Sequence, residues 1–228
     1  IFEGASWVGY SYFFLTIIKF FFGNIKFIYH SHNIDYEIRR EKFFIGKITF
    51  YLEKFLINKV DVFTVVSQED KKKIYNLYKK KVSIVKNGVV ISKKKIKKIK
   101  KNIILFSGSI DFKENKIAFK KFYRNIYPLL KKKYKNYKIV VTGTKINLKE
   151  NVYQTGVLKY QEYLKLLRKT KLCIYPFRKG PGTKIKVIEA LCNDVPIITN
   201  KHGFRGLDIK HKSKLIYRSN LELKNKIK

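Results

Sequence analysis

Residues 176–199, PFRKGPGTKIKVIEALCNDVPIIT, form the stretch that decides the fold. A short apolar run at 172–176 leads into it and is long enough for a buried strand. A basic turn with two glycines follows, and from Thr183, the predicted N-cap, the apolar residues take helical spacing. A second apolar run at 195–199 completes the order strand, turn, helix, strand. This order predicts a βαβ unit.

The turn and the helix start of this unit form a predicted anion site. The first amides of a helix are unpaired and its dipole is positive there, while Gly180 and Gly182 let a ligand approach the backbone. Lys186 and Glu189 lie three residues apart and share a face of the predicted helix. They could form a surface ion pair, or Lys186 could hold a diphosphate while Glu189 binds a ribose diol. The opposite, apolar side of the helix is predicted to carry Ile185, Ile188, Leu191 and Cys192.

The composition bounds the class of protein. With 228 residues and 45% hydrophobic content, the chain can form a sizeable core, with two lobes expected. Its net charge of +36 would ordinarily suggest nucleic acid as a partner. However, only seven of the 52 basic residues are arginines, which favours lysines scattered by coding bias over an arginine-rich binding face. We therefore expect no specific nucleic-acid partner and only loose attraction to anionic lipid.

The cysteines and the start of the chain give further expectations. Cys173 and Cys192 are far apart, lack metal spacing and lie in apolar runs, so free thiols in a reducing compartment are predicted. The apolar, aromatic run at 7–23 is interrupted by Lys19 and is short for a membrane span, so it predicts a buried or interfacial helix. The chain has no methionine and opens on Ile1, which predicts a fragment.

The first half of the chain alternates strands and helices. A strand candidate within 24–31 runs into the polar cluster HSHNID. The cluster lies just past the carboxyl end of this strand, and open α/β sheets bind ligands at the carboxyl ends of their strands. Strand alternation places His30 and His32 on one face, but with no third ligand nearby in the sequence a metal site is not expected. The remaining predicted elements are a helix over 36–58, a buried strand over 60–66, a helix capped by Ser67 and a strand over 82–85.

The second half begins after a lysine-dense segment at 92–101, which we take as the linker between domains 1–95 and 102–228. Strands are predicted at 103–106, 137–142, 152–155 and 172–176, and helices at 115–133, with a bend at Pro128, and at 161–169. Strands that alternate with helices predict parallel, doubly wound sheets in both domains. The fold class is therefore α/β.

Several further stretches carry a resemblance to a known family. In order they are YHSHNIDYEIR, VDVFTVVSQEDKKKI and VKNGV, then GSIDFKEN, KIVVTG, the 176–199 stretch and HGFRGL. Together they resemble the family 4 retaining glycosyltransferases of the GT-B fold, which has two Rossmann-like domains. The resemblance covers nearly the whole chain and implies that the first domain lacks its opening strand and that the terminal helices are absent.

The resemblance also implies site residues. Two glutamates separated by seven residues mark the family's commonest form, and here Pro181 takes the first position and Glu189 the second. The chain therefore resembles a glycine-rich, lysine-bearing branch. Ser109 stands where a basic residue is usual, so lysines must supply the phosphate-binding charge. The implied donor-binding residues are Gly108, Ser109, Lys113, Asn115, Gly180, Gly182, Thr183, Lys184, Lys186 and Glu189. The implied catalytic residues are His32 and Glu189, and the acceptor-side residues are Asn33, Asp35 and Arg39.

The activity implied by the resemblance is transfer of a sugar from a nucleotide-diphosphate sugar to a glycan or lipid-linked acceptor, as in polysaccharide or glycolipid synthesis. No Asp-x-Asp motif occurs, so neither a metal nor another cofactor is expected. The implied location is the cytoplasm, with peripheral contact at the inner face of an anionic membrane. Two alternatives stay open: a non-catalytic remnant that binds nucleotide sugar, and a sugar-nucleotide epimerase.

Overall fold

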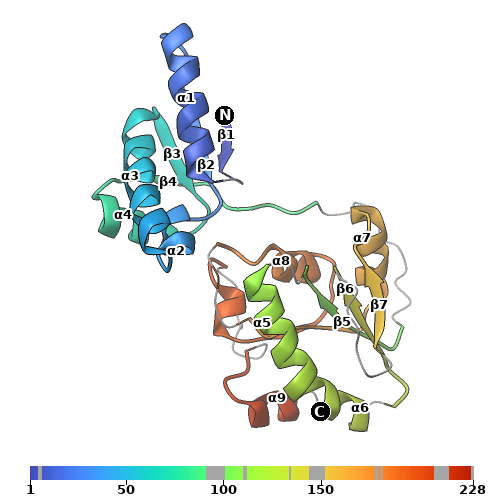
Figure 1. Cartoon of the computed structure of the whole chain (residues 1–228). Coiled ribbons are helices and arrows are strands. Elements are labelled where there is room, and N and C mark those ends of the chain that lie inside the picture. Colours follow the sequence, from blue (N-terminus) through green and yellow to red (C-terminus); the bar gives the residue numbers. More distant parts are fainter. Residues whose placement is uncertain are drawn as a thin grey trace. The chain divides into compact units, whose positions relative to one another are not determined.

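The computed structural model describes residues 1–4, 7–90, 101–109, 112–133, 135–143, 152–177, 180, 182–207 and 216–226. They form two compact units (Figure 1). Unit 1 comprises Ile1–Asn87 with two short later segments, Gly180–Thr183 and Arg205–Leu207. Unit 2 comprises the rest of the chain. The predicted linker at 92–101, apart from Lys101, lies outside the described residues.

Unit 1 contains a four-stranded parallel sheet with the strands in sequential order. The strands are β1 (Phe2–Gly4), β2 (Ile28–Ser31), β3 (Val62–Val65) and β4 (Ser83–Ile84). Connections between parallel strands are right-handed as a rule, so sequential order places the crossover helices on one face of the sheet. The burial of β2 agrees, because Tyr29 and Ser31 are buried whereas Ile28 and His30 are half-buried.

The helices of unit 1 are α1 (Val8–Phe21), α2 (Asp35–Arg39), α3 (Phe43–Lys59) and α4 (Gln68–Tyr78). Ser67 caps α4 as predicted, since its side chain accepts a hydrogen bond from the Asp70 amide. The single helix predicted over 36–58 is wrong, because α2 and α3 are separate. Gly46 allows the sharp turn between them: a side-chain carbon there would lie 2.9 Å from the Arg40 Cα.

Unit 2 contains a five-stranded parallel sheet in the order β7-β6-β5-β8-β9. The strands are β5 (Ile103–Ser107), β6 (Lys138–Thr142), β7 (Tyr153–Gly156), β8 (Leu172–Tyr175) and β9 (Ile197–Thr199). The chain lays β6 and β7 on one side of β5 and then β8 and β9 on the other. Because the direction of winding reverses at β5, this is a doubly wound sheet.

The helices of unit 2 are α5 (Lys113–Lys121), α6 (Tyr127–Lys133), α7 (Tyr160–Lys169), α8 (Ile185–Cys192) and α9 (Asn220–Lys226), with a 3-10 turn at Lys201–Phe204. A π-helical turn, Phe122–Ile126, joins α5 and α6 where one helix bent at Pro128 was predicted. Proline has no amide hydrogen and its ring crowds the carbonyl four residues earlier, so the helix widens ahead of Pro128.

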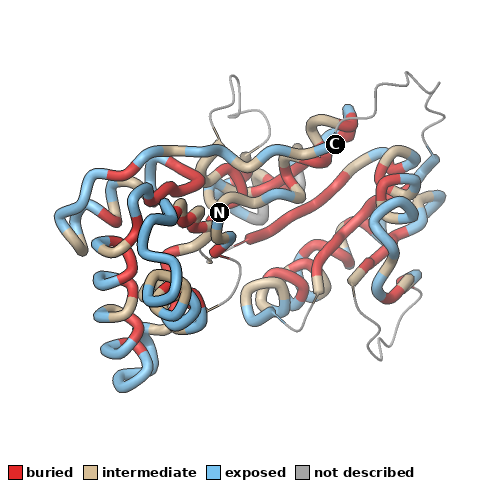
Figure 2. The backbone as a smooth tube through the Cα atoms, turned by 90° about the horizontal axis from the view of Figure 1, so that it is seen from above, coloured by how far each residue is buried: buried red, intermediate tan, exposed pale blue. Residues whose placement is uncertain are grey.

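Helix α8 differs most from its prediction. It begins at Ile185 with Lys184 as N-cap, so the prediction of Thr183 as N-cap is wrong. Its buried residues are Val187, Glu189 and Ala190, whereas Ile185 is exposed. The side predicted to face solvent therefore faces the interior. Figure 2, coloured by burial, shows buried residues in both units. Neither cysteine forms a disulfide, and Cys173 is buried as predicted whereas Cys192 is half-buried.

Candidate donor site and the residues around it

The carboxyl ends of β5 and β8 mark the point in the unit 2 sheet where the winding direction reverses. Ser107 ends β5 and Tyr175 ends β8, and their hydroxyl groups lie 3.0 Å apart. In open α/β sheets the two chain directions leave a crevice at such a point, and ligands bind there. The topology alone therefore selects the residues that follow Ser107 as part of a binding site.

Residues that follow β5 gather with Lys186 from α8. A side-chain carbon at Gly108 would lie 3.2 Å from the Lys186 Nζ and 3.1 Å from the Asn115 Cγ. Lys186 donates a hydrogen bond to the Ser107 carbonyl (3.2 Å), and the Asn115 amide donates to the Ser109 carbonyl (2.8 Å). Four predicted donor-site residues, Gly108, Ser109, Asn115 and Lys186, are thus brought together within unit 2.

Gly143, just after β6, holds this loop from its other side. Its φ of +94° belongs to the left-handed region that favours glycine. A side-chain carbon at this position would lie 2.6 Å from the Gly108 carbonyl carbon and 2.7 Å from the Ser109 amide nitrogen. The backbone of the predicted donor loop therefore packs directly on a glycine.

Lys186 and Glu189 are not a surface ion pair. Glu189 is only 8% exposed, and burial raises the pKa of its carboxyl group, opposed by hydrogen bonding from Tyr160 and by the Lys186 charge. Burial also lowers the pKa of Lys186 to about 8. A half-buried cation and a buried carboxylate beside a glycine loop form a polar site inside an apolar domain, which is typical of functional sites.

Two tyrosines of α7 lie beside the Lys186–Glu189 cluster, and the sequence analysis did not predict them. Tyr160 and Tyr163 lie near the Glu189 carboxylate. The Tyr163 hydroxyl group is buried but makes no hydrogen bond of normal geometry in the described part of the chain. Their spacing of three residues places both rings on one face of α7, and that spacing was the one sequence feature that could have indicated them.

The other predicted donor-site residues lie apart from this cluster or in unit 1. Lys113 is exposed at the first residue of α5, and the Lys184 Nζ lies 5.6 Å from the centre of the Phe177 ring. Gly180 and Gly182 have φ values of +118° and +66°, so both need glycine. These two glycines and Thr183 are grouped with unit 1.

Arg205, which the sequence analysis did not select, fixes the glycine turn in unit 1. Its guanidinium donates to the Gly180 carbonyl (3.2 Å) and pairs with the buried Asp70 carboxylate (2.5 Å). Ser67 donates to the same carboxylate (2.6 Å). The arginine thus joins the turn to the start of α4 through a buried ion pair.

The predicted acceptor-side residues follow β2 in unit 1. The His32 Nε2 lies 2.6 Å from a Glu3 carboxylate oxygen. The His32 carbonyl would lie 2.8 Å from a side-chain carbon placed at Gly182, and the Asn33 side chain is in contact with the same position. The Asp35 carboxylate accepts from the Val8 amide at the start of α1 and pairs with Arg39 (2.7 Å). Asp35 therefore joins α2 to the start of α1, and Arg39 pairs with it from within α2. Burial raises the pKa of the Asp35 carboxyl group.

Glu53 on α3 is a second buried carboxylate that sequence reasoning missed. It accepts hydrogen bonds from the Asp35 amide (2.8 Å), the Tyr36 amide (3.2 Å) and the Tyr78 hydroxyl (2.6 Å). Burial raises the pKa of its carboxyl group to about 7. Glu53 thus caps the start of α2, and its role in unit 1 is structural.

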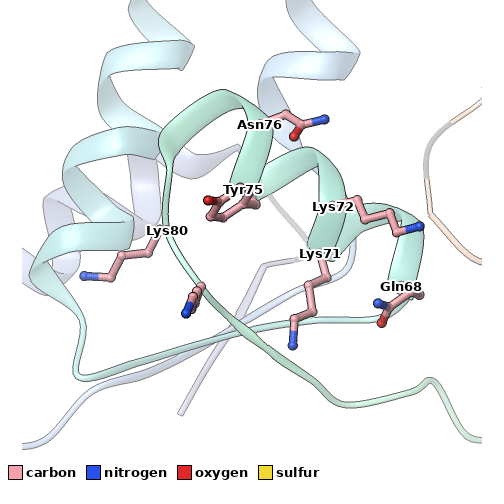
Figure 3. A pocket seen from close by; sticks show the side chains of 7 residues that line it. Gln68, Lys71, Lys72, Tyr75, Asn76 and Lys80 are labelled. Carbon is pink, nitrogen blue, oxygen red and sulfur yellow. The ribbon is translucent and has the colours of Figure 1, made fainter.

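A pocket of about 430 Å³ lies on α4 and the segment that follows it (Figure 3). It is lined by Gln68, Lys71, Lys72, Tyr75, Asn76, Lys80 and Lys81. None of these residues was predicted to bind a donor or an acceptor. The pocket is therefore a basic surface feature of unit 1, separate from the cluster around Lys186 in unit 2.

Comparison with solved structures shows the fold. The chain matches a TarM variant from S. aureus in complex with fondaparinux, alpha-GlcNAc-glycerol and UDP at a TM-score of 0.67 and 18% identity, covering 93% of this chain and 45% of that one. It matches sucrose-phosphate synthase from Thermosynechococcus elongatus at 0.67 and 12% identity, covering 95% and 61%. It matches Anabaena HepE in complex with UDP and glucose at 0.64 and 13% identity, covering 94% and 64%. The chain thus has the GT-B fold and spans about half to two thirds of the length of these structures.

No curated protein matches the chain. Residues 101–227, however, match the family described as Glycosyl transferases group 1. The match covers more than half of the chain and includes both the loop after β5 and helix α8, which carry the cluster around Lys186. The chain therefore belongs to the group 1 glycosyl transferases.

Proposed function

We propose that this chain forms part of a family 4 retaining glycosyltransferase that moves a sugar from a nucleotide-diphosphate sugar to a glycan or lipid-linked acceptor. One observation carries the proposal: Lys186 contacts the Gly108 loop where the winding of the unit 2 sheet reverses, and the Glu189 carboxylate interacts with the Lys186 charge. A cation can bind the diphosphate of a nucleotide, and a carboxylate can bind its ribose diol. A glycine backbone without a side chain leaves room for the base beside them.

In this proposal Lys186 stabilises the leaving diphosphate. Its amine is held against the Ser107 carbonyl and is partly withdrawn from water, so it interacts with phosphate more strongly than a fully exposed lysine would. Negative charge on the diphosphate grows as the glycosidic bond breaks, and a fixed cation lowers the energy of that transition state. The transfer step then needs no metal ion at the diphosphate.

Glu189 has the role of ribose acceptor. Its carboxylate can accept hydrogen bonds from two adjacent hydroxyl groups, and Tyr160 beside it orients the carboxylate. The buried Tyr163 hydroxyl, which lacks a hydrogen bond of normal geometry in the described residues, offers a further group to a bound nucleotide. The structures of TarM and HepE named above contain UDP, which makes UDP the first nucleotide to test.

On the acceptor side we propose His32, with Asn33 beside it, as the residues that contact the transferred sugar or the acceptor. His32 is half-buried, and its imidazole reaches the exposed Glu3 carboxylate. Asp35 and Arg39 pair with each other, so they position the loop that carries His32 and Asn33.

The reaction products distinguish the proposed transferase from the two alternative functions. A transferase yields a glycosylated acceptor and free nucleoside diphosphate, an epimerase yields a changed sugar, and a remnant binds the donor without turnover. Mass spectrometry of a longer protein containing this chain, with a panel of nucleotide sugars and acceptors, distinguishes the three. A changed sugar without transfer would contradict our proposal, and so would binding without turnover.

Glu189→Gln is expected to lower UDP affinity at least about tenfold, because a charge-assisted hydrogen bond contributes roughly 1.5–3 kcal/mol. A 2′-deoxy analogue of UDP should bind the native protein weakly and lose little further affinity in the variant. Removing the 2′-hydroxyl and removing the Glu189 charge both weaken the same hydrogen bond, so their effects should not add. Calorimetry with both ligands on both proteins measures this. Glu162→Gln on exposed α7 surface is the control, because glutamine retains the capping bond to the Lys159 amide. Unchanged affinity in Glu189→Gln would remove this residue from the site.

We further propose a cytoplasmic location with peripheral contact at an anionic membrane. Cysteines without a disulfide, as here, are typical of a reducing compartment. Among the described residues no helix is long and apolar enough to cross a bilayer.

Helices α1 and α3 pack against each other, and both expose aromatic side chains: Tyr10, Phe13, Phe14, Phe20, Phe21, Phe43, Phe44, Tyr51 and Phe55. Lysines 47 and 54 are exposed on the same pair of helices. Apolar rings beside lysines suit an anionic lipid surface better than RNA or DNA.

Changing both Phe20 and Phe21, which are 83% and 70% exposed, to serine should reduce binding to vesicles containing anionic phospholipid by at least about tenfold. Phe112→Ser is the matched control, because Phe112 is 66% exposed on unit 2. Co-sedimentation with anionic and with neutral vesicles measures the partition. Equal binding to both vesicle types, or equal loss in the control, would contradict membrane contact through α1.

A further inference from the structure

Three metal-ligating side chains meet on the sheet of unit 1. In the parallel register of β1 and β2, Glu3 lies beside His30, and His32 follows two residues later on the same face. The two imidazole rings are 4.7 Å apart between centroids and nearly perpendicular. One ligand atom from each of Glu3, His30 and His32 lies within 4.8 Å of the other two. The sequence-based expectation that no third ligand is near the histidines is therefore wrong.

The hydrogen bonds around His30 favour one tautomer of its ring. Its Nδ1 lies 2.7 Å from the Thr64 hydroxyl oxygen, and Thr64 is its register partner on β3. The Thr64 hydroxyl in turn donates to the Tyr29 carbonyl (3.4 Å), so its oxygen is free to accept the proton on Nδ1. This arrangement leaves the lone pair of His30 on Nε2. A hydrogen bond from the second ring nitrogen is the usual support of a metal-binding histidine.

The set of ligands selects the kind of ion. Two imidazole nitrogens and one carboxylate suit zinc and its neighbours, whereas Mg²⁺ and Ca²⁺ prefer oxygen ligands alone. Ligand atoms bound to one zinc ion are at most about 4.2 Å apart, since each bond is about 2.1 Å long. The exposed Glu3 side chain can close the remaining difference by rotation, and its hydrogen bond to His32 is then replaced by two bonds to the ion.

We propose that Glu3, His30 and His32 bind one Zn²⁺-class ion on the sheet of unit 1, with Thr64 orienting His30. Three protein ligands leave the fourth position of a tetrahedral ion for water. The net charge of +36 weakens attraction of any cation. At 0.15 M salt, however, screening limits that repulsion to charges within about 8 Å. Since the ion occupies the His32 ring, it should inhibit any reaction that uses this histidine and should not assist the transfer itself.

The test is titration of the full chain, without a histidine tag, with Co²⁺ as spectroscopic probe and Zn²⁺ as competitor at 0.15 M salt. The expected result is one equivalent of Co²⁺ with intense tetrahedral absorption bands, displaced by Zn²⁺ and unaffected by Mg²⁺. His30→Ala, His32→Ala and Glu3→Gln should each weaken binding by more than about tenfold. Thr64→Val should weaken it by about 10–100-fold, as loss of a supporting hydrogen bond does.

The control is His202→Ala, because His202 lies in unit 2 and should leave Co²⁺ binding unchanged. Glu3 is the exposed middle residue of β1, so Glu3→Gln keeps the test valid even where a histidine variant disturbs folding. Absent tetrahedral bands, or equal losses in His202→Ala and His32→Ala, would overturn the proposal. The experiment measures ion binding, so its result does not depend on whether the chain transfers sugar.

Discussion

Replacing Glu53 with alanine is expected to lower the free energy of unfolding of unit 1 by about 3–5 kcal/mol, because it breaks the hydrogen-bond network around a buried carboxyl group. Glu53 is only 2% exposed, and its carboxylate accepts from two backbone amides and the Tyr78 hydroxyl. Without it, one buried and two partly buried donors lose their acceptor, and an unpaired buried group costs about 1–3 kcal/mol. Urea unfolding followed by fluorescence measures this in unit 1, because Trp7, the single tryptophan, lies there.

The same carboxylate should make the stability of unit 1 depend on pH. The pKa of Glu53 rises from 4.5 to about 7 on folding, so between these values the folded state binds more protons than the unfolded chain. The contribution of Glu53 to stability is therefore fully present below about pH 4.5 and is lost as pH rises through 7. Glu53→Gln should flatten this dependence. Glu69→Ala, at an exposed position of α4, is the control and should change stability by less than about 0.5 kcal/mol. A similar small change in Glu53→Ala would contradict the structural role.

Lys186→Met is expected to reduce UDP affinity at pH 7 by at least about tenfold, because a hydrogen bond to a charged group contributes about 1.5–3 kcal/mol. In the native protein the affinity should also fall about tenfold between pH 7 and 9, since a lysine of pKa about 8 loses its proton over that range. Binding at pH 9 must then take up a proton. Calorimetry in two buffers of different ionisation enthalpy detects this proton, and Lys186→Met should not take it up.

Lys186→Arg is the matched comparison, because arginine keeps its charge throughout this range and should show a flat pH profile. Without ligand, the stability of the native protein should rise as pH increases from about 8 to 10.5, because the unfolded chain there binds the proton that the folded chain has lost. A native pH profile identical to that of Lys186→Met would mean that Lys186 does not contact the diphosphate.

Much of the fold could be predicted from local patterns. The continuous apolar runs gave β3 and β5 within one or two residues, since strands buried on both faces leave few polar positions. Ser67 was recognised as a cap because its acceptor and the α4 amides are neighbours in the sequence. The loop after β5 and the α8 residues Lys186 and Glu189 were selected together because the residues around them resemble one family, and unit 2 brings Gly108 and Lys186 into contact.

The errors arose where tertiary contacts decide. Helix α8 is apolar on most of its surface, so periodicity could not identify the side that faces the interior, and Glu189 was placed on the wrong side. Strand β1 has three residues and no recognisable pattern, and only its pairing with β2 defines it. Glu3 was therefore missed as the partner of His30 and His32, which follow about 27 residues later.

The packing of Gly143 against the loop after β5 bears on how such a chain can change during evolution. Any side chain at 143 must displace the backbone of Gly108 and Ser109, so selection for folding alone retains this glycine. Lineages that lose sugar transfer should keep Gly143 and drift first at Lys186 and Glu189, whose burial is costly without a ligand. A homologous domain that has lost activity should therefore retain the glycines of this site and carry apolar residues at positions 186 and 189.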